Sequence, residues 1–235
     1  MEKWIKYLLI ILFILFLITI RNNNLNNSPD KSKLLDNIEY QIQKGGHGHL
    51  LLSKHILQKH NNRNKILIEI GSVRENIPGQ NSTEHFINLC KAYDMKFISV
   101  DIDKDCSNNV LKLCKDNNFN NYEIHTMKGE DFLKKIDSFD YIYLDGYDYD
   151  HGGHSEERQE KYIKILGKKI NNEDSHNSHL EMVENISNKG KDDSLICIDD
   201  IISDNQGKGV KSIPFLLKNG WKIKEKNNNS IIFSK

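Results

Sequence analysis

The stretch "KILIEIGS", residues 65–72, is a short apolar run that stops at Gly71. A run of about four to eight aliphatic residues that ends at a glycine is typical of a buried β-strand. Four further runs of this kind follow along the chain, at residues 96–100, 122–127, 139–144 and 194–198. Segments whose apolar residues recur at helical spacing separate them. Strands that alternate with helices predict a parallel sheet covered by helices on both faces.

The segments on either side of these runs complete the pattern. Helical spacing precedes the first run at residues 33–44 and 49–60 and returns near 208–219. The chain then ends in "WKIKEK" (221–226) and "SIIFSK" (230–235), two strand-like segments joined by "NNN", which predict a hairpin. We therefore expect an α/β fold: a Rossmann-like, doubly wound, mostly parallel seven-stranded sheet with a C-terminal antiparallel hairpin.

Acidic residues stand at the carboxyl end of each of the five predicted parallel strands. They are Glu69, the pair Asp101 and Asp103, the pair Glu130 and Asp131, Asp145, and the pair Asp199 and Asp200. In an open parallel sheet, ligands bind beyond these ends, near the point where the strand order reverses. Carboxylates gathered at one edge repel one another unless hydroxyls, amines or a metal ion satisfy them. The pattern thus predicts a ligand site at this edge.

With these motifs in this order, residues from about 40 to 235 resemble the class I S-adenosylmethionine-dependent methyltransferases. The resemblance implies S-adenosylmethionine (SAM) as cofactor and a set of residues that bind it. These are Glu69, Gly71 and Ser72 beside its methionine part, Asp101 and Ile102 at its ribose, and Asp131 with the adjacent Glu130 at its adenine. A carboxylate only accepts hydrogen bonds, which suits the paired ribose hydroxyls.

Two further motifs resemble the metal-dependent O-methyltransferases and the related cephalosporin-hydroxylase-like group. They are "LDG" (144–146) and "IDD" (198–200), whose carboxylates in those proteins hold a divalent cation. The resemblance implies that Asp145, Asp199 and Asp200 bind such an ion. Oxygen ligands of this kind suit Mg²⁺, which would orient a substrate hydroxyl and favour its deprotonation.

The acidic loop after the fourth strand, "LDGYDYDHGGH", adds two histidines. Together with Asp145, His151 and His154 are candidates for a catalytic role, because a neutral imidazole can accept a proton. Residues 146–175 form an insertion that we expect to lie over the active site. The segment "GGHGHL" (45–50) either lets backbone amides meet the cofactor or is a link that breaks a helix.

The N-terminus is different in composition. Residues 4–20, "WIKYLLIILFILFLITI", are apolar apart from Lys6, which predicts one transmembrane helix before the sheet. This gives an anchor at 1–21, a polar Asn-rich tether at 22–34 and the Rossmann-like domain at 35–235. A cleaved signal peptide is the alternative, although no small-x-small cleavage site follows.

The rest of the composition bears on the compartment and the partners. Four cysteines without C-x-x-C spacing, and a glycosylation sequon at Asn81 beside the predicted cofactor site, favour a catalytic domain on the cytosolic side of a membrane that the chain crosses once. Lys plus Arg equals Asp plus Glu, 33 each. That balance argues against a nucleic-acid partner bound through a broad basic surface and favours a small-molecule substrate.

We therefore expect an enzyme, a SAM-dependent methyltransferase that uses a divalent metal to methylate a hydroxyl of a small or membrane-proximal molecule. One alternative is a type II membrane glycosyltransferase, in which Asp101 and Asp103 form a D-x-D motif for a metal and a nucleotide-sugar. Another is a non-catalytic, membrane-tethered Rossmann-like binding module. It stays open because the family pattern is G-x-G-x-G, whereas the next glycine after Gly71 is Gly79.

Overall fold

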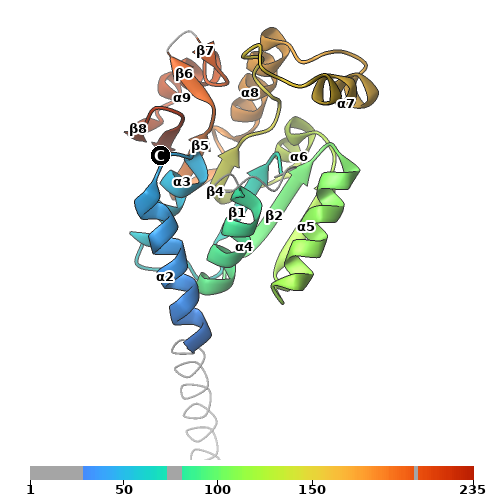
Figure 1. The fold of residues 1–235 in the computed structure, drawn as a ribbon. Coiled ribbons are helices and arrows are strands. Elements are labelled where there is room, and N and C mark those ends of the chain that lie inside the picture. Colours follow the sequence, from blue (N-terminus) through green and yellow to red (C-terminus); the bar gives the residue numbers. More distant parts are fainter. Residues whose placement is uncertain (1–28, 73–80, 204–205) are drawn as a thin grey trace, which may run out of the picture.

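The computed structural model describes residues 29–72, 81–203 and 206–235. Its centre is a seven-stranded sheet in the order β3-β2-β1-β4-β5-β9-β8 (Figure 1). The strands are β1 (Ile66–Ile70), β2 (Lys96–Asp101), β3 (Tyr122–Thr126), β4 (Phe139–Leu144), β5 (Gly190–Ile198), β8 (Lys222–Lys226) and β9 (Ile231–Ser234). Strands β1 to β5 are parallel, and β9 is antiparallel to both β5 and β8. The predicted sheet and its C-terminal hairpin are confirmed.

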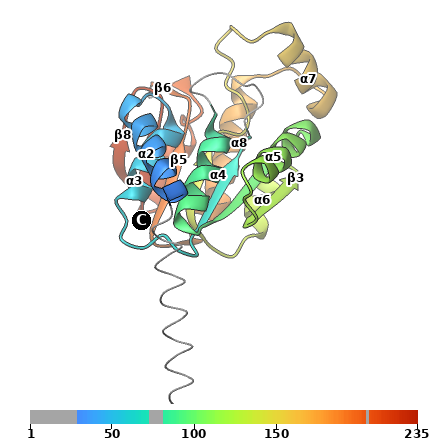
Figure 2. The same ribbon diagram turned by 60° about the horizontal axis from the view of Figure 1, so that its bottom comes forward.

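Helices cover both faces of the sheet (Figures 1 and 2). One face carries α2 (Pro29–Lys44), α3 (Gly48–Leu57), α4 (Ser82–Tyr93) and α5 (Lys104–Asp116), and the other carries α6 (Gly129–Lys135), α8 (Asn172–Ile186) and α9 (Ser212–Lys218). Helix α7 (Glu156–Leu166) packs on neither face and stands beyond the carboxyl ends of the strands. A small second sheet, β6 (Ile201–Ser203) with β7 (Gln206–Gly207), follows β5 and was not predicted.

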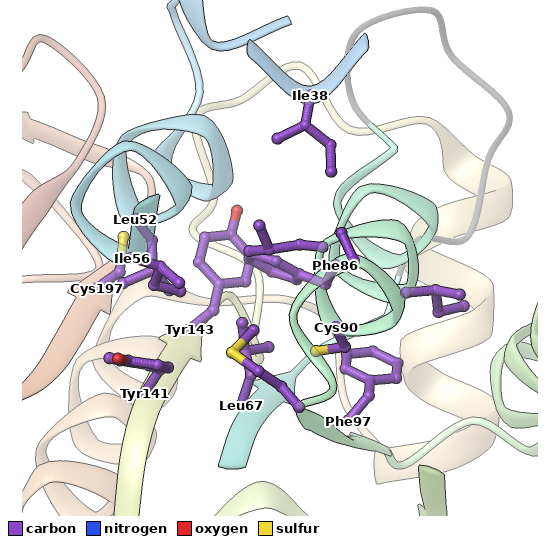
Figure 3. Close-up of a cluster of buried hydrophobic side chains, with 14 of the residues drawn as sticks. Ile38, Leu52, Ile56, Leu67, Phe86, Cys90, Phe97, Tyr141, Tyr143 and Cys197 are labelled. Carbon is purple, nitrogen blue, oxygen red and sulfur yellow. The ribbon is translucent and has the colours of Figure 1, made fainter. Parts of the chain in front are cut away.

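The central strands β1, β2 and β4 are mostly apolar because both of their faces are buried, whereas the edge strands β3 and β8 are more polar and more exposed. Leu67 and Tyr143 point into the cluster under α2 to α5, whereas Ile68 and Ile142 point into the cluster under α6, α8 and α9. Figure 3 shows the first cluster, in which Tyr143 lies beside Phe86 of α4, with ring centroids 5.3 Å apart. This two-sided packing fixes the strand ends, and therefore the loops that carry the site.

The membrane prediction concerns a part of the chain that is not described. The predicted anchor, residues 1–21, lies outside the described residues, and among those residues no helix is long and apolar enough to cross a membrane. Helix α2 begins at Pro29, so the last part of the predicted tether, 22–34, is helical. A proline suits this place because its missing N–H would have no partner in the first turn of a helix.

Candidate active site

Two cavities open at the carboxyl edge of the sheet, where the strand order reverses between β1 and β4. The first has a volume of about 230 Å³ and lies between the ends of β1 and β2, the start of α6, and helices α7 and α8. The second has a volume of about 440 Å³ and lies over β4 and β5, between the start of α3 and the loop that follows β4. Both occupy the position at which open parallel sheets bind their ligands.

The two cavities meet where the chain leaves β1 and β4. Gly71 lines the first cavity and Ser72 the second, while Gly146 lines the first and Asp145 the second. The two backbones pass so closely that a Cβ on Gly71 would lie 2.5 Å from the carbonyl oxygen of Asp145, and Gly71 has a φ of +89°. Only glycine combines that conformation with that approach. The crossing therefore separates the two cavities by a wall one residue thick.

Asp101 closes one end of the first cavity. Its carboxylate accepts the backbone N–H of Ser72 at 2.8 Å and that of Asp103 at 2.7 Å, which fixes both oxygens. Each oxygen has a second lone pair, so the group can still accept from a ligand. Ile102 lines the same cavity. Asp101, Ile102 and Gly71 thus line one cavity together, and their roles in binding a cofactor stay a prediction.

The acidic pair at the start of α6 is divided by the helix. Glu130 lines the first cavity and accepts a hydrogen bond from the hydroxyl of Ser178 on α8. Asp131 is exposed and does not line either cavity. Consecutive helical residues point about 100° apart, so only one of the two can face the site. The structure places Glu130 there, whereas the sequence prediction favoured Asp131.

Glu69 lies behind the site and lines neither cavity. Its side chain is fully buried and accepts hydrogen bonds from Ser82 at 2.7 Å and Thr83 at 2.9 Å. Burial raises the pKa of this carboxyl to about 8, against the effect of the two hydroxyl donors. Glu69 therefore joins β1 to the first turn of α4, a role different from the predicted contact with the cofactor.

Asp103 holds two elements over the first cavity. It caps the N-terminus of α5 by accepting the backbone N–H of Asp105 at 2.9 Å, and it forms an ion pair with Lys161 of α7. The ion pair brings α7 over the cavity, which Tyr162 of the same helix also lines. Since both functions of its carboxylate are structural, Asp103 is not placed as the second ligand of a D-x-D motif.

The second cavity is lined almost throughout by polar groups. The loop after β4 contributes Asp148, which pairs with Arg158 at 3.0 and 3.3 Å. His151 and His154 lie on the same loop with ring centroids 4.4 Å apart, and Nε2 of His154 is 2.8 Å from the carbonyl oxygen of Tyr149. The structure thus brings Asp145, His151 and His154 to one cavity, as predicted, with His151 on its exposed rim.

The segment "GGHGHL" contributes residues that the prediction left undecided. His47 is the N-cap of α3, and His49 lies in its first turn; both line the second cavity. The ring of His49 lies 6.4 Å from that of Tyr143, and burial lowers its pKa well below the usual value, so the imidazole is neutral. The two histidines at i and i+2 beside glycines were the signal in the sequence for this contribution.

The three carboxylates predicted to hold a metal ion do not form a ligand set. The ammonium group of Lys208 contacts Oδ1 of Asp145 and lies 2.8 Å from Oδ2 of Asp200. Asp199 instead accepts a hydrogen bond from the hydroxyl of Tyr143. Within the described part of the chain, no group of three or more His, Cys, Asp or Glu is arranged to hold a metal ion. These residues do not fit the predicted divalent cation, because a lysine already supplies the positive charge.

Lys208 remains charged although its side chain is fully buried. Burial alone would lower its pKa, but the carboxylates of Asp145 and Asp200 raise it well above the usual value. In return, Lys208 lowers the pKa of Asp200. For Asp145, burial and the neighbouring aspartates outweigh Lys208 and raise the pKa to about 7. The sequence gives no sign of this lysine, which lies in a loop nine residues after Asp199.

No protein-family model and no curated protein matches the chain. Solved structures do match in fold. Precorrin-6y C5,15-methyltransferase from Geobacter metallireducens is 10% identical over 79% of this chain and 84% of that chain, with a TM-score of 0.50. SMU.1697c, a candidate methyltransferase from Streptococcus mutans solved with SAH, is 11% identical over 80% of this chain and 94% of that chain, with a TM-score of 0.50.

A third solved structure is matched over only half of its own length. NSun6 from Pyrococcus horikoshii, solved with SFG, is 15% identical over 79% of this chain and 50% of that chain, with a TM-score of 0.52. Together with the strand order, these likenesses show that the chain has the fold of the class I SAM-dependent methyltransferases. The predicted resemblance to that superfamily is confirmed at the level of the fold.

Proposed function

We propose that this chain is a class I SAM-dependent methyltransferase that transfers a methyl group to a hydroxyl of a small polar molecule. The observation that carries the proposal is the meeting of the two cavities at Gly71–Ser72 and Asp145–Gly146. A group-transfer enzyme needs two sites that share one wall, so that donor and acceptor atoms can come into contact. SAM supplies an electrophilic methyl group when it is bound.

The first cavity suits the adenosine part of the cofactor. Asp101 can accept from the two ribose hydroxyls, and Glu130 can accept from the adenine amine. Ile102, Leu166 and Met182 provide apolar walls for a planar ring. Among the described residues, the first cavity borders the second at the crossing of Gly71 and Asp145, so we place the reacting end of the cofactor there.

The second cavity suits a hydroxyl-bearing acceptor rather than an apolar one. Arg158 pairs with Asp148, Lys208 is shared by Asp145 and Asp200, and Asp199 accepts a hydrogen bond from the neutral hydroxyl of Tyr143. Imidazoles and hydroxyls make up much of the remaining wall. Such a wall offers many hydrogen-bond partners and has more carboxylates than cations, which suits a small polyhydroxylated molecule better than a phosphate backbone.

Asp145 is the group best placed to take the acceptor's proton. A hydroxyl must lose a proton as its oxygen takes the methyl group, and a base works best when its pKa lies near the working pH. Asp145 stands at the crossing of the two cavities, and burial together with the neighbouring aspartates raises its pKa above the usual value, towards that pH. His151 and His154 lie on the rim, from which they can orient the acceptor.

The test is a calorimetric titration of the full chain with S-adenosylhomocysteine. We expect binding in the presence of EDTA, since no residue of the first cavity needs a metal. Asp101→Asn, which keeps the shape of the side chain, should weaken binding about tenfold or more, equal to about 1.4 kcal/mol. Asp131→Asn is the matched control, because that exposed residue lies outside the cavity, and it should bind like the wild type.

The rival functions give different results in this titration, in a titration with a nucleotide-sugar and Mn²⁺, or in an activity screen with SAM. A glycosyltransferase would bind a nucleotide-sugar with Mn²⁺ and ignore S-adenosylhomocysteine. A binding module without activity would bind the cofactor but leave it unconsumed with every hydroxyl acceptor in a screen. Absence of any binding by S-adenosylhomocysteine to the folded chain would refute the proposal.

A further inference from the structure

We propose that the ammonium group of Lys208 takes the place of a metal ion beside the acceptor cavity and holds the carboxylates of Asp145 and Asp200 in position. Removal of this charge would turn the two carboxylates into a site for a divalent ion. The inference deepens the proposed function and rests on it in one respect, namely that the second cavity binds the methyl acceptor. The contacts of Lys208 are the same whatever molecule the chain binds. Lys208 lines neither cavity, so it is a positioning residue that acts through the two aspartates.

The backbone delivers Lys208 to this place by a tight turn. Asp200 adopts a φ of +52°, and its carbonyl oxygen accepts the backbone N–H of Lys208 at 3.0 Å. Gly207 has a φ of +95° and passes so close to the backbone of Asp200 that a side chain would not fit. The strands β6 and β7 thus fold the chain back onto the end of β5, which aims Lys208 at the end of β4.

All three donors of the ammonium group have acceptors. They are Oδ1 of Asp145, the carbonyl oxygen of Asp145 at 3.3 Å, and Oδ2 of Asp200 at 2.8 Å. A lysine offers three donors and no acceptor, so this environment satisfies it fully. The side chain thereby fastens the loop after β4 to the loop after β5, which are the two loops that a metal ion would otherwise join.

The other titratable groups near Lys208 do not supply a positive charge to Asp145 and Asp200 in its place. His179 of α8 is fully buried close to Lys208, but burial, followed by the charge of Lys208, lowers its pKa to about 3, so the ring is neutral. Arg158 is engaged by Asp148. Without the ammonium group, Asp145 and Asp200 would face each other with Asp199 one residue away, which is an arrangement that binds a hard cation through oxygen.

Binding of Mn²⁺ alone, followed by electron paramagnetic resonance on the full chain, tests the inference without an acceptor. The wild type should show no bound Mn²⁺ at about 1 mM of the free ion. Lys208→Met keeps the length of the side chain and removes the charge. The Lys208→Met chain should bind one Mn²⁺ with a dissociation constant at least about tenfold below 1 mM. Adding Asp145→Asn to the same chain should abolish that site.

Two control variants separate charge from position. Lys208→Arg keeps the positive charge and should behave like the wild type towards Mn²⁺. Lys211→Met removes a nearby lysine that pairs with Glu173 at the surface and should create no site. Titration of each variant with S-adenosylhomocysteine shows whether the first cavity is intact.

Two outcomes overturn the inference. One is a Mn²⁺ site in the wild type that Asp145→Asn removes. This result would overturn the inference even if Lys208→Met fails to fold. The other is a Lys208→Met chain that still binds S-adenosylhomocysteine and binds no Mn²⁺. Conversely, the expected Mn²⁺ results in a chain that never binds S-adenosylhomocysteine would support the role of Lys208 and refute the methyltransferase proposal, so the two failures are distinguishable.

Discussion

Gly71 combines two constraints that no other residue type can meet, a φ of +89° and close contact with the backbone of Asp145. We predict that Gly71→Ala lowers the free energy of unfolding by about 3 kcal/mol or more, because strain and overpacking add. Gly167→Ala is the matched control: its φ is +75°, but nothing lies within 4 Å of the added Cβ. It should cost only about 1 kcal/mol. Urea denaturation of the two variants measures the difference, and equal losses would contradict the account of the crossing.

Glu69 makes stability depend on pH. Its pKa in the folded chain, about 8, lies above the usual value of 4.5, so between these values the folded state keeps a proton that the unfolded state has lost. Stability contributed by the protonated carboxyl is therefore full below about pH 4.5 and is lost as the pH rises towards 8. We predict that Glu69→Gln gains about 3 kcal/mol relative to the wild type between pH 5 and pH 8. If the difference in free energy of unfolding between Glu69→Gln and the wild type is the same at all pH values, Glu69 is ionised in the folded state.

At the residue scale, the sequence predicted positions better than roles. Asp101, Gly71, Ile102 and Asp145 all line the cavities as expected, because each ends or directly follows a buried strand whose end is fixed by packing. The choice between Glu130 and Asp131 depends on how α6 is rotated, which the apolar spacing of so short a helix does not determine. Lys208 reaches the site only through the turn at Gly207, a long-range effect with no local pattern.

At the scale of elements, the main feature of the site is the position of helix α7 over it. It packs on neither face of the sheet, and it reaches the domain through Lys161, which pairs with Asp103, and Arg158, which pairs with Asp148. Each pair joins α7 to one cavity. The helix thus lies over both cavities. The predicted insertion at 146–175 includes α7 and the first residues of α8, and its status as an insertion stays a prediction.

We predict that Lys161→Met speeds the dissociation of S-adenosylhomocysteine several-fold, because α7 would open more often over the first cavity. Lys164→Met, on an exposed position of the same helix, is the control and should leave the rate unchanged. Stopped-flow measurement of ligand release compares the two. Equal rates in both variants and the wild type would mean that α7 does not gate the cavity.

The strands were predicted more precisely than the helix that precedes the C-terminal hairpin. Apolar runs at 65–70 and 139–144 match β1 and β4 within one residue, because a strand buried on both faces leaves a continuous apolar signal. The helix expected at 208–219 is shorter, Ser212–Lys218, since the residues before it form the turn that carries Lys208. Local propensity could not reveal that turn, which is held by contacts with Asp200.

At the scale of the whole molecule, residues 4–20 still imply a membrane, and we propose that the chain is anchored there by one span. We predict that the full chain sediments with membranes and resists extraction by high salt. A chain that begins at Pro29, which keeps α2 whole, should stay in the supernatant. A full chain recovered in the supernatant with its N-terminus intact would refute the anchor, and a chain shortened near residue 21 would indicate a signal peptide instead.

The central claim is that two cavities serve a donor and an acceptor across the crossing of Gly71 and Asp145. A crystal structure of the chain soaked with S-adenosylhomocysteine tests it most directly. We predict ribose hydroxyls within hydrogen-bonding distance of Asp101, the adenine beside Glu130, and the sulfur atom at the crossing, facing the cavity lined by Asp145. Electron density for the ligand elsewhere, or with its sulfur turned away from that cavity, would contradict the account.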